Sequence, residues 1–191
     1  MILNESERLL HLGASNSIRK NNDKTYAISA RAENHLGTEL IDATFEDINE
    51  SNLLGGELAY VNGSFTLQGE YMQSTLIGVT ENKLSSYYSQ ISYFLTGENR
   101  PYKSSLDGFG KVSPINNYGK GSKGAIELVA RISQICLQNV DMGQLNDITV
   151  GLNWYLNPNT RVMLNYVMGE MTKGTEIITE NAVMMRVQLG F

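Results

Sequence analysis

Apolar and polar residues alternate strictly in short segments along this chain, and this alternation limits its possible folds more than any other feature. The last segment shows it most clearly, because one face carries Val183, Met185, Val187 and Leu189 while the other carries Ala182, Met184, Arg186 and Gln188. A period of two is typical of a β-strand with one apolar face. About nine such segments of roughly 7 to 13 residues recur between turn-forming stretches. The pattern therefore predicts an all-β, antiparallel chain.

The earlier segments obey the same rule, and they lie at residues 9–17, 26–32, 57–62, 65–71, 87–96, 125–135, 147–155 and 161–169. Asn62-Gly63 predicts a tight hairpin, and Asn157-Pro158-Asn159 predicts another turn. The expected short connections lie at residues 18–24, 62–63 and 156–159, and the expected long ones at 33–51, 75–85, 137–143 and 170–180. Alternating short and long connections are typical of transmembrane β-barrels.

Two environments explain the apolar face, because a sandwich buries it in a core whereas a membrane barrel turns it toward lipid. The opposite face carries small residues and single charges, as a water-filled lumen requires. Trp154, Tyr155, Tyr60 and Phe65 cluster near strand ends, where interfacial aromatics lie. These features favour the barrel. A soluble β-barrel or sandwich that binds a ligand stays as the alternative, and it would hide the apolar face inside.

Charge is distributed unevenly within a chain of net charge -5. Residues 33–51 hold six acidic and no basic side chains, and we expect them to form an acidic outer loop. Residues 98–123 are long for a turn and hold two acidic and five basic side chains, namely Arg100, Lys103, Lys111, Lys120 and Lys123. We expect this connection to fold into the lumen, where its cations would lower the barrier for anions.

Strand parity also places charged side chains on the inner face. The basic ones are Arg31, Arg131, Arg161 and Arg186, and the acidic ones are Glu57, Glu70, Glu127 and Asp147. Such charges either line an anion path or pair across neighbouring strands and hold the wall in shape.

Other classes of protein lack their sequence signals here. No window holds the ~18 consecutive apolar residues of a membrane-spanning helix, and Cys136 has no second cysteine to pair with. His11 and His35 lie in separate segments without metal-ligand spacing, so we expect no metal and no cofactor. The net charge disfavours a nucleic-acid partner, and nothing marks an enzymatic nucleophile. The first residues, MILNESER, lack the pattern of a secretory signal.

Four runs of sequence are the most distinctive, namely RLLHLGAS (8–15), LQGEYM (67–72), SYFLTGENRPY (92–102) and GLNWYLNPNTRVMLNYV (151–167). They resemble the C-terminal half of the phosphate-selective porins of the O and P type. The resemblance extends from about residue 8 to residue 191. It implies a sixteen-stranded outer-membrane β-barrel of a Gram-negative bacterium, of which residues 1–191 would be the C-terminal part of the single barrel domain.

The resemblance also implies a function and partners. The function would be passive diffusion of small anions, including phosphate or polyphosphate, and the chain would not be an enzyme. The partners would be outer-membrane lipid, two further copies in a homotrimer, and the assembly machinery, which would recognise the terminal Phe191. Because about nine strands do not close a barrel, a non-functional truncated porin stays as a further alternative.

Overall fold

The computed structural model describes residues 2–5, 8–104, 108–137, 140 and 142–190, and in these ranges the chain is all-β and antiparallel, as predicted. Two hairpins pair only within themselves, β3 (Tyr26–Arg31) with β4 (Glu39–Phe45) and β8 (Tyr102–Ser104) with β9 (Gly108–Phe109). All other strands form one nine-stranded sheet, in the order β1 (Ile2–Glu5), β2 (Arg8–Lys20), β5 (Ile48–Asn62), β6 (Phe65–Gly78), β7 (Glu81–Phe94), β10 (Ala125–Cys136), β11 (Gln144–Asn157), β12 (Thr160–Lys173) and β13 (Glu176–Leu189).

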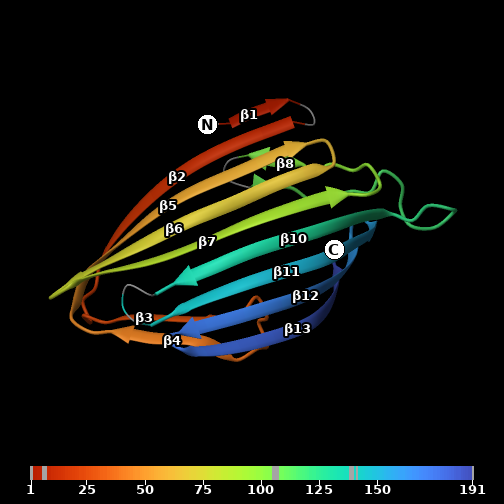
Figure 1. Cartoon of the computed structure of the whole chain (residues 1–191). Coiled ribbons are helices and arrows are strands. Elements are labelled where there is room, and N and C mark those ends of the chain that lie inside the picture. Colours follow the sequence, from red (N-terminus) through yellow and green to blue (C-terminus); the bar gives the residue numbers. More distant parts are fainter. Residues whose placement is uncertain (1, 6–7, 105–107, 138–139, 141, 191) are drawn as a thin grey trace.

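The nine-stranded sheet curves into an open trough, and both hairpins lie inside it (Figure 1). β1 and β13 are the two edges of the sheet, so the described strands do not close into a barrel. Among the described residues there is no helix long and apolar enough to cross a membrane.

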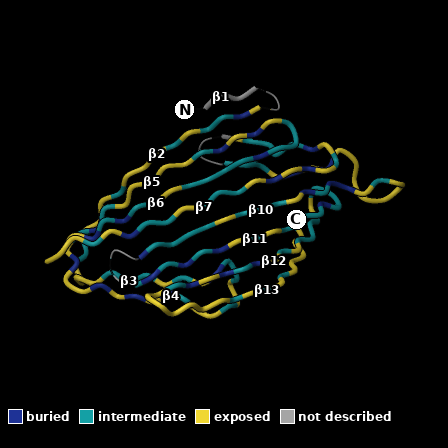
Figure 2. Tube along the Cα trace, viewed as in Figure 1, coloured by how far each residue is buried: buried dark blue, intermediate teal, exposed yellow. Residues whose placement is uncertain are grey.

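The two faces of the trough differ as the alternation predicts. Leu152 stands opposite Leu128 on β10 and Leu164 on β12, and all three side chains are exposed on the outer face. Exposed and less exposed residues alternate along these strands (Figure 2). A soluble sandwich would bury this apolar face in its core, whereas here it forms the outer surface.

One predicted wall strand is not part of the wall. The segment at residues 26–32 forms β3, which pairs with β4, while β2 pairs directly with β5. The prediction failed because a period of two identifies a strand but not its partner. The apolar face of β3, with Tyr26 and Ile28, packs inside the trough instead. Arg31 is therefore on a hairpin and not on the wall.

Two of the predicted long connections are also wrong. The segments 75–85 and 170–180 are mostly strand, and only residues 79–80 and 174–175 lie between the paired strands. Glu81 and Lys83 are exposed polar residues at the start of β7, and such residues are as typical of a loop as of a strand end. The hairpin at Asn62-Gly63 is confirmed, with Gly63 at a positive φ of 56°.

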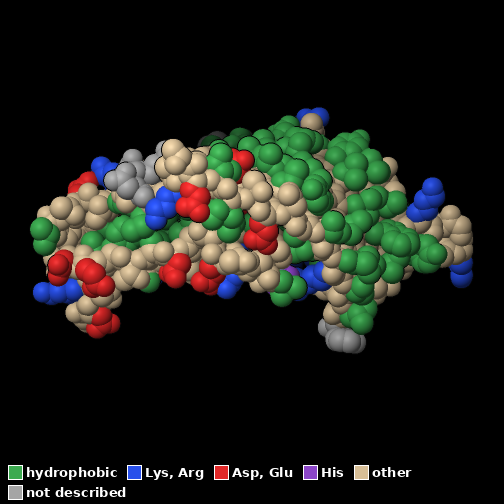
Figure 3. Space-filling view, turned by 60° about the horizontal axis from the view of Figure 1, so that its bottom comes forward, with side chains coloured by type: hydrophobic (Ala, Val, Ile, Leu, Met, Phe, Trp, Pro, Cys, Tyr) green, Lys and Arg blue, Asp and Glu red, His purple; other side chains and the backbone are tan. Residues whose placement is uncertain are grey.

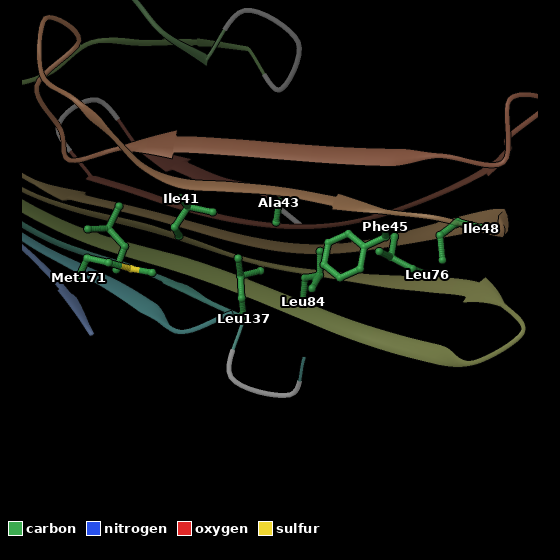
Figure 4. Packing of buried hydrophobic residues seen from close by; sticks show 9 residues of the cluster. Ile41, Ala43, Phe45, Ile48, Leu76, Leu84, Leu137 and Met171 are labelled. Atoms are coloured by element: carbon green, nitrogen blue, oxygen red, sulfur yellow. The ribbon is translucent and has the colours of Figure 1, made fainter. Parts of the chain in front are cut away.

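The acidic segment 33–51 does not form an outer loop, because β4 carries much of it into the trough. Ile41, Ala43 and Phe45 on β4 join a buried cluster with wall residues of β6, β7, β11 and β12, namely Leu76, Leu84, Leu145 and Met171 (Figure 4). The apolar faces of two elements thus meet inside the trough. Burial of this cluster holds the hairpin against the wall.

Candidate functional site

A basic pocket lies on the inner face of the trough, beside the turn between β11 and β12. Its volume is about 440 Å³, and three predicted site residues line it: Arg100, Lys111 and Arg161. The Lys111 ammonium donates a hydrogen bond to Oδ1 of Asn159 at 2.5 Å. The Arg161 guanidinium donates to Oε1 of Gln188 at 2.8 Å. These neutral amide partners orient both cations without neutralising them.

Arg100 differs from the other two cations because it forms a buried ion pair with Glu127 on β10. Glu127 is fully buried, and its other oxygen accepts hydrogen bonds from Asn153 and Tyr155, each at 2.9 Å. The Arg100 side chain is only 16% exposed. The pair holds the start of the long connection against the wall, and the Glu127 carboxylate neutralises the charge of Arg100.

A second charged cluster ties the β3–β4 hairpin to the wall. The Glu33 carboxylate accepts hydrogen bonds from Arg131 at 2.5 Å and from Ser133 and Thr149 at 2.7 Å each. The Arg131 guanidinium also lies 3.8 Å from the ring centroid of Tyr88. Arg131 is on the inner face as predicted, but a carboxylate neutralises it.

The predicted residue Arg31 is neutralised within its own hairpin. Its guanidinium donates to Glu39 at 2.5 Å and to the carbonyl oxygen of Gly37 at 3.1 Å. Acidic side chains gather in the half of the molecule that holds this hairpin, whereas hydrophobic ones dominate the other half (Figure 3). The hairpin therefore contributes little positive charge to any path along the trough.

A groove lies between the β8–β9 hairpin and the inner face of β2, β5 and β6, and its charged lining residues are His11, Glu57 and Glu70. The Tyr102 hydroxyl lies 2.6 Å from Nδ1 of His11, and Nε2 of His11 lies 2.9 Å from Glu57. Burial and the nearby Glu57 carboxylate raise the pKa of the Tyr102 phenol. Glu70 stands directly opposite Glu57 and accepts a hydrogen bond from Tyr88 at 2.6 Å. This groove is acidic, in contrast to the basic pocket.

Four predicted site residues lie outside these clusters. Arg186 is exposed on the inner face, opposite Met163. Lys103 is exposed on β8, and Lys120 and Lys123 are exposed farther along the same connection. Within the part of the chain that the structure describes, no group of three or more His, Cys, Asp or Glu residues could hold a metal ion. Phe191 lies outside the described residues.

Sequence reasoning missed Glu33 and Tyr102 as residues that fasten the inserted segments. Glu33 contacts residues about one hundred positions away, so no local pattern could reveal its partners. Tyr102 did carry a signal, because it is an aromatic residue inside a polar connection. The parity that placed Glu57, Glu70 and Glu127 inward was correct.

Comparisons with known proteins agree with this geometry. The profile of the family described as phosphate-selective porin O and P matches residues 2–191. Porin O of Pseudomonas aeruginosa is 26% identical, over 91% of this chain and 46% of that protein. An uncharacterised protein of Caulobacter vibrioides is 28% identical, over 82% of this chain and 33% of its own length.

The chain thus spans about half or less of the length of these two curated relatives. The family match nevertheless covers nearly every residue, including all strands of the open sheet. An antiparallel sheet with an apolar outer face and a polar, charged inner face is what a porin wall requires. The chain belongs to the phosphate-selective porin O and P family.

Proposed function

We propose that this chain forms part of the wall of a passive outer-membrane channel for small anions, phosphate included. The observation that carries the proposal is the basic pocket, where Lys111 and Arg161 face the trough with no carboxylate partner among the described residues. Charged side chains that line a pore set its ion selectivity. Transport through such a channel involves no covalent chemistry.

Ion pairing distinguishes Lys111 and Arg161 from three of the other predicted cations. Arg100 is paired with Glu127, and the pairs of Arg31 and Arg131 with Glu39 and Glu33 lie at 2.5 Å. Paired charges cancel at a distance, so they act weakly on a passing ion. The oxygens of Asn159 and Gln188 accept hydrogen bonds from Lys111 and Arg161, which leaves other N–H groups of both cations for an anion.

The open edges support a barrel completed by further strands. An unpaired edge exposed to lipid costs several kcal/mol for each unsatisfied backbone group. We infer that β1 and β13 pair with additional strands, and that the complete barrel assembles in the outer membrane of a Gram-negative bacterium as a homotrimer. Recognition of Phe191 by the assembly machinery belongs to this proposal.

The test is the reversal potential, in a planar bilayer under a potassium chloride gradient, of the complete barrel in which this chain is paired with its additional strands. Lys111→Glu and Arg161→Glu should each shift the reversal potential toward cation preference. Lys120→Glu is the matched control, because it makes the same charge change at an exposed position outside the pocket. An equal shift in all three variants, or no shift in any of them, would contradict the role of the basic pocket.

The identity of the anion needs a separate measurement. Inorganic phosphate added to a chloride-conducting channel should reduce the chloride current if both ions use the basic pocket. The reduction should weaken in Arg161→Glu, because guanidinium groups bind phosphate oxygens strongly. Polyphosphate added in the same assay tests the longer substrate. Absence of block by either anion would restrict the function to general anion diffusion.

A further inference from the structure

The second half of the long connection leaves the trough and reaches the outer face of the wall. Trp154 belongs to the outer face, since it is in register with Ile126 on β10 and Val162 on β12. The ring of Tyr118 packs edge-on against Trp154, with 5.3 Å between centroids and 88° between planes. The Trp154 indole N–H donates to the carbonyl oxygen of Lys123 at 2.6 Å.

The end of this segment is a defined tight turn. Gly119 and Ser122 exchange backbone hydrogen bonds of 3.1 and 3.0 Å. Lys120 and Gly121 between them both have positive φ, at 49° and 87°. Two successive residues with positive φ make a compact turn that closes a hairpin. The turn places Lys120 at its tip.

We name residues 115–124 the lysine tip. It contains Lys120 and Lys123 and no acidic residue, and both lysines are exposed. In Figure 1 it is the green-to-teal loop that projects beyond β10, and Figure 3 shows basic side chains beyond the hydrophobic surface at this end. Along the outer surface toward this end of the molecule, the apolar strand residues come first, Trp154 and Tyr118 follow, and the lysines lie farthest out.

This order matches the profile of a membrane surface. Tryptophan and tyrosine prefer the boundary between hydrocarbon and headgroups, and lysines beyond that boundary attract anionic lipids. We propose that the lysine tip binds anionic phospholipid headgroups beside the barrel, and does not line the pore. Lys120 and Lys123 then act on lipid, while Lys111 of the same connection acts on the permeating anion. The proposal rests on the membrane placement in the proposed function, but not on conduction.

The test uses Trp154, which is the only tryptophan of the chain. The full chain is folded into vesicles that contain equal phosphatidylcholine and phosphatidylglycerol, with bromine on the acyl chains of one lipid or the other. Brominated phosphatidylglycerol should quench Trp154 fluorescence about twofold more than brominated phosphatidylcholine, and high salt should reduce this difference.

The double variant Lys120→Gln/Lys123→Gln should remove the difference between the two brominated lipids. Lys173→Gln at the end of β12 is the control, and it should keep the difference. Equal quenching by both lipids in the unmodified chain would overturn the proposal. Weak quenching by either lipid, with an emission that changes with protein density, would indicate contact with a second copy and would overturn it too. The double variant should also leave the reversal potential unchanged, which separates this proposal from the role of the basic pocket.

Discussion

Loss of Glu127 should destabilise the protein far more than loss of a similar glutamate at an exposed site. Glu127 is fully buried, and one carboxylate serves Arg100, Asn153 and Tyr155. In Glu127→Ala the guanidinium of Arg100 stays buried with no counter-charge. Breaking a buried ion pair from one side costs about 3–5 kcal/mol, largely because of the charge left behind.

The chain offers a matched control in the pair between Arg31 and Glu39. The residue types are the same, but these side chains are 44% and 39% exposed. Water screens such a pair, so Glu39→Ala should cost only about 0.2–1 kcal/mol. The contrast between the two variants separates the cost of losing the buried network around Glu127 from the cost of losing an exposed Arg–Glu contact.

Urea unfolding of the chain in lipid vesicles, followed by circular dichroism, measures both costs. The double variant Arg100→Ala/Glu127→Ala should be more stable than Glu127→Ala alone, because it removes the buried charge as well as its partner. If Glu127→Ala falls within about 1 kcal/mol of Glu39→Ala, burial does not control the strength of this pair. The structural role assigned to Glu127 would then be wrong.

Two further predictions concern the turns and the inner hairpins. Gly124→Ala should lower the free energy of unfolding in urea by about 1–3 kcal/mol, because Gly124 has a φ of 71° and an added Cβ would lie 2.3 Å from the Tyr155 carbonyl oxygen. Gly56→Ala is the control and should cost much less, because an added Cβ there would meet no atom within 4 Å. Equal costs of the two variants would contradict the steric argument. The raised pKa of Tyr102 means that folding favours the neutral phenol, so its contribution to stability is complete below its unfolded pKa of about 10 and is lost as pH rises through the folded pKa. Unfolding midpoints at increasing alkaline pH should fall more steeply for the unmodified chain than for Tyr102→Phe, and parallel curves would contradict this.

Sequence alone predicted the orientation of side chains much better than the pairing of strands. The alternation within residues 125–135, 147–155 and 161–169 puts Leu128, Leu152 and Leu164 on the apolar face of each strand, and the register places them side by side on the outer surface. Parity is a local property of an extended backbone, because successive side chains point to opposite faces. Any segment that forms a strand must obey it, whatever its partner.

Pairing and insertion depend instead on contacts between distant parts of the chain. The strand β3 has the same alternation as a wall strand, yet its apolar residues pack against the inside of the trough. The bond from Thr149 to Glu33 joins residues 116 positions apart. Neither contact leaves a mark in the local sequence of either partner. The position of the acidic hairpin could therefore be learned only from the fold.

The predicted basic residues differ in their electrostatic surroundings once the chain is folded. The sequence offers nine basic side chains as candidates for an anion path, and it leaves open which of them pair with carboxylates. The fold pairs Arg31, Arg100 and Arg131 with carboxylates and carries Lys120 and Lys123 to the exposed lysine tip. Only unpaired charge on the inner face acts on an ion in the trough, because a neutralised pair has a short-ranged field. Anion preference in this part of the barrel should therefore depend on Lys103, Lys111, Arg161 and Arg186 much more than on the basic residues as a whole.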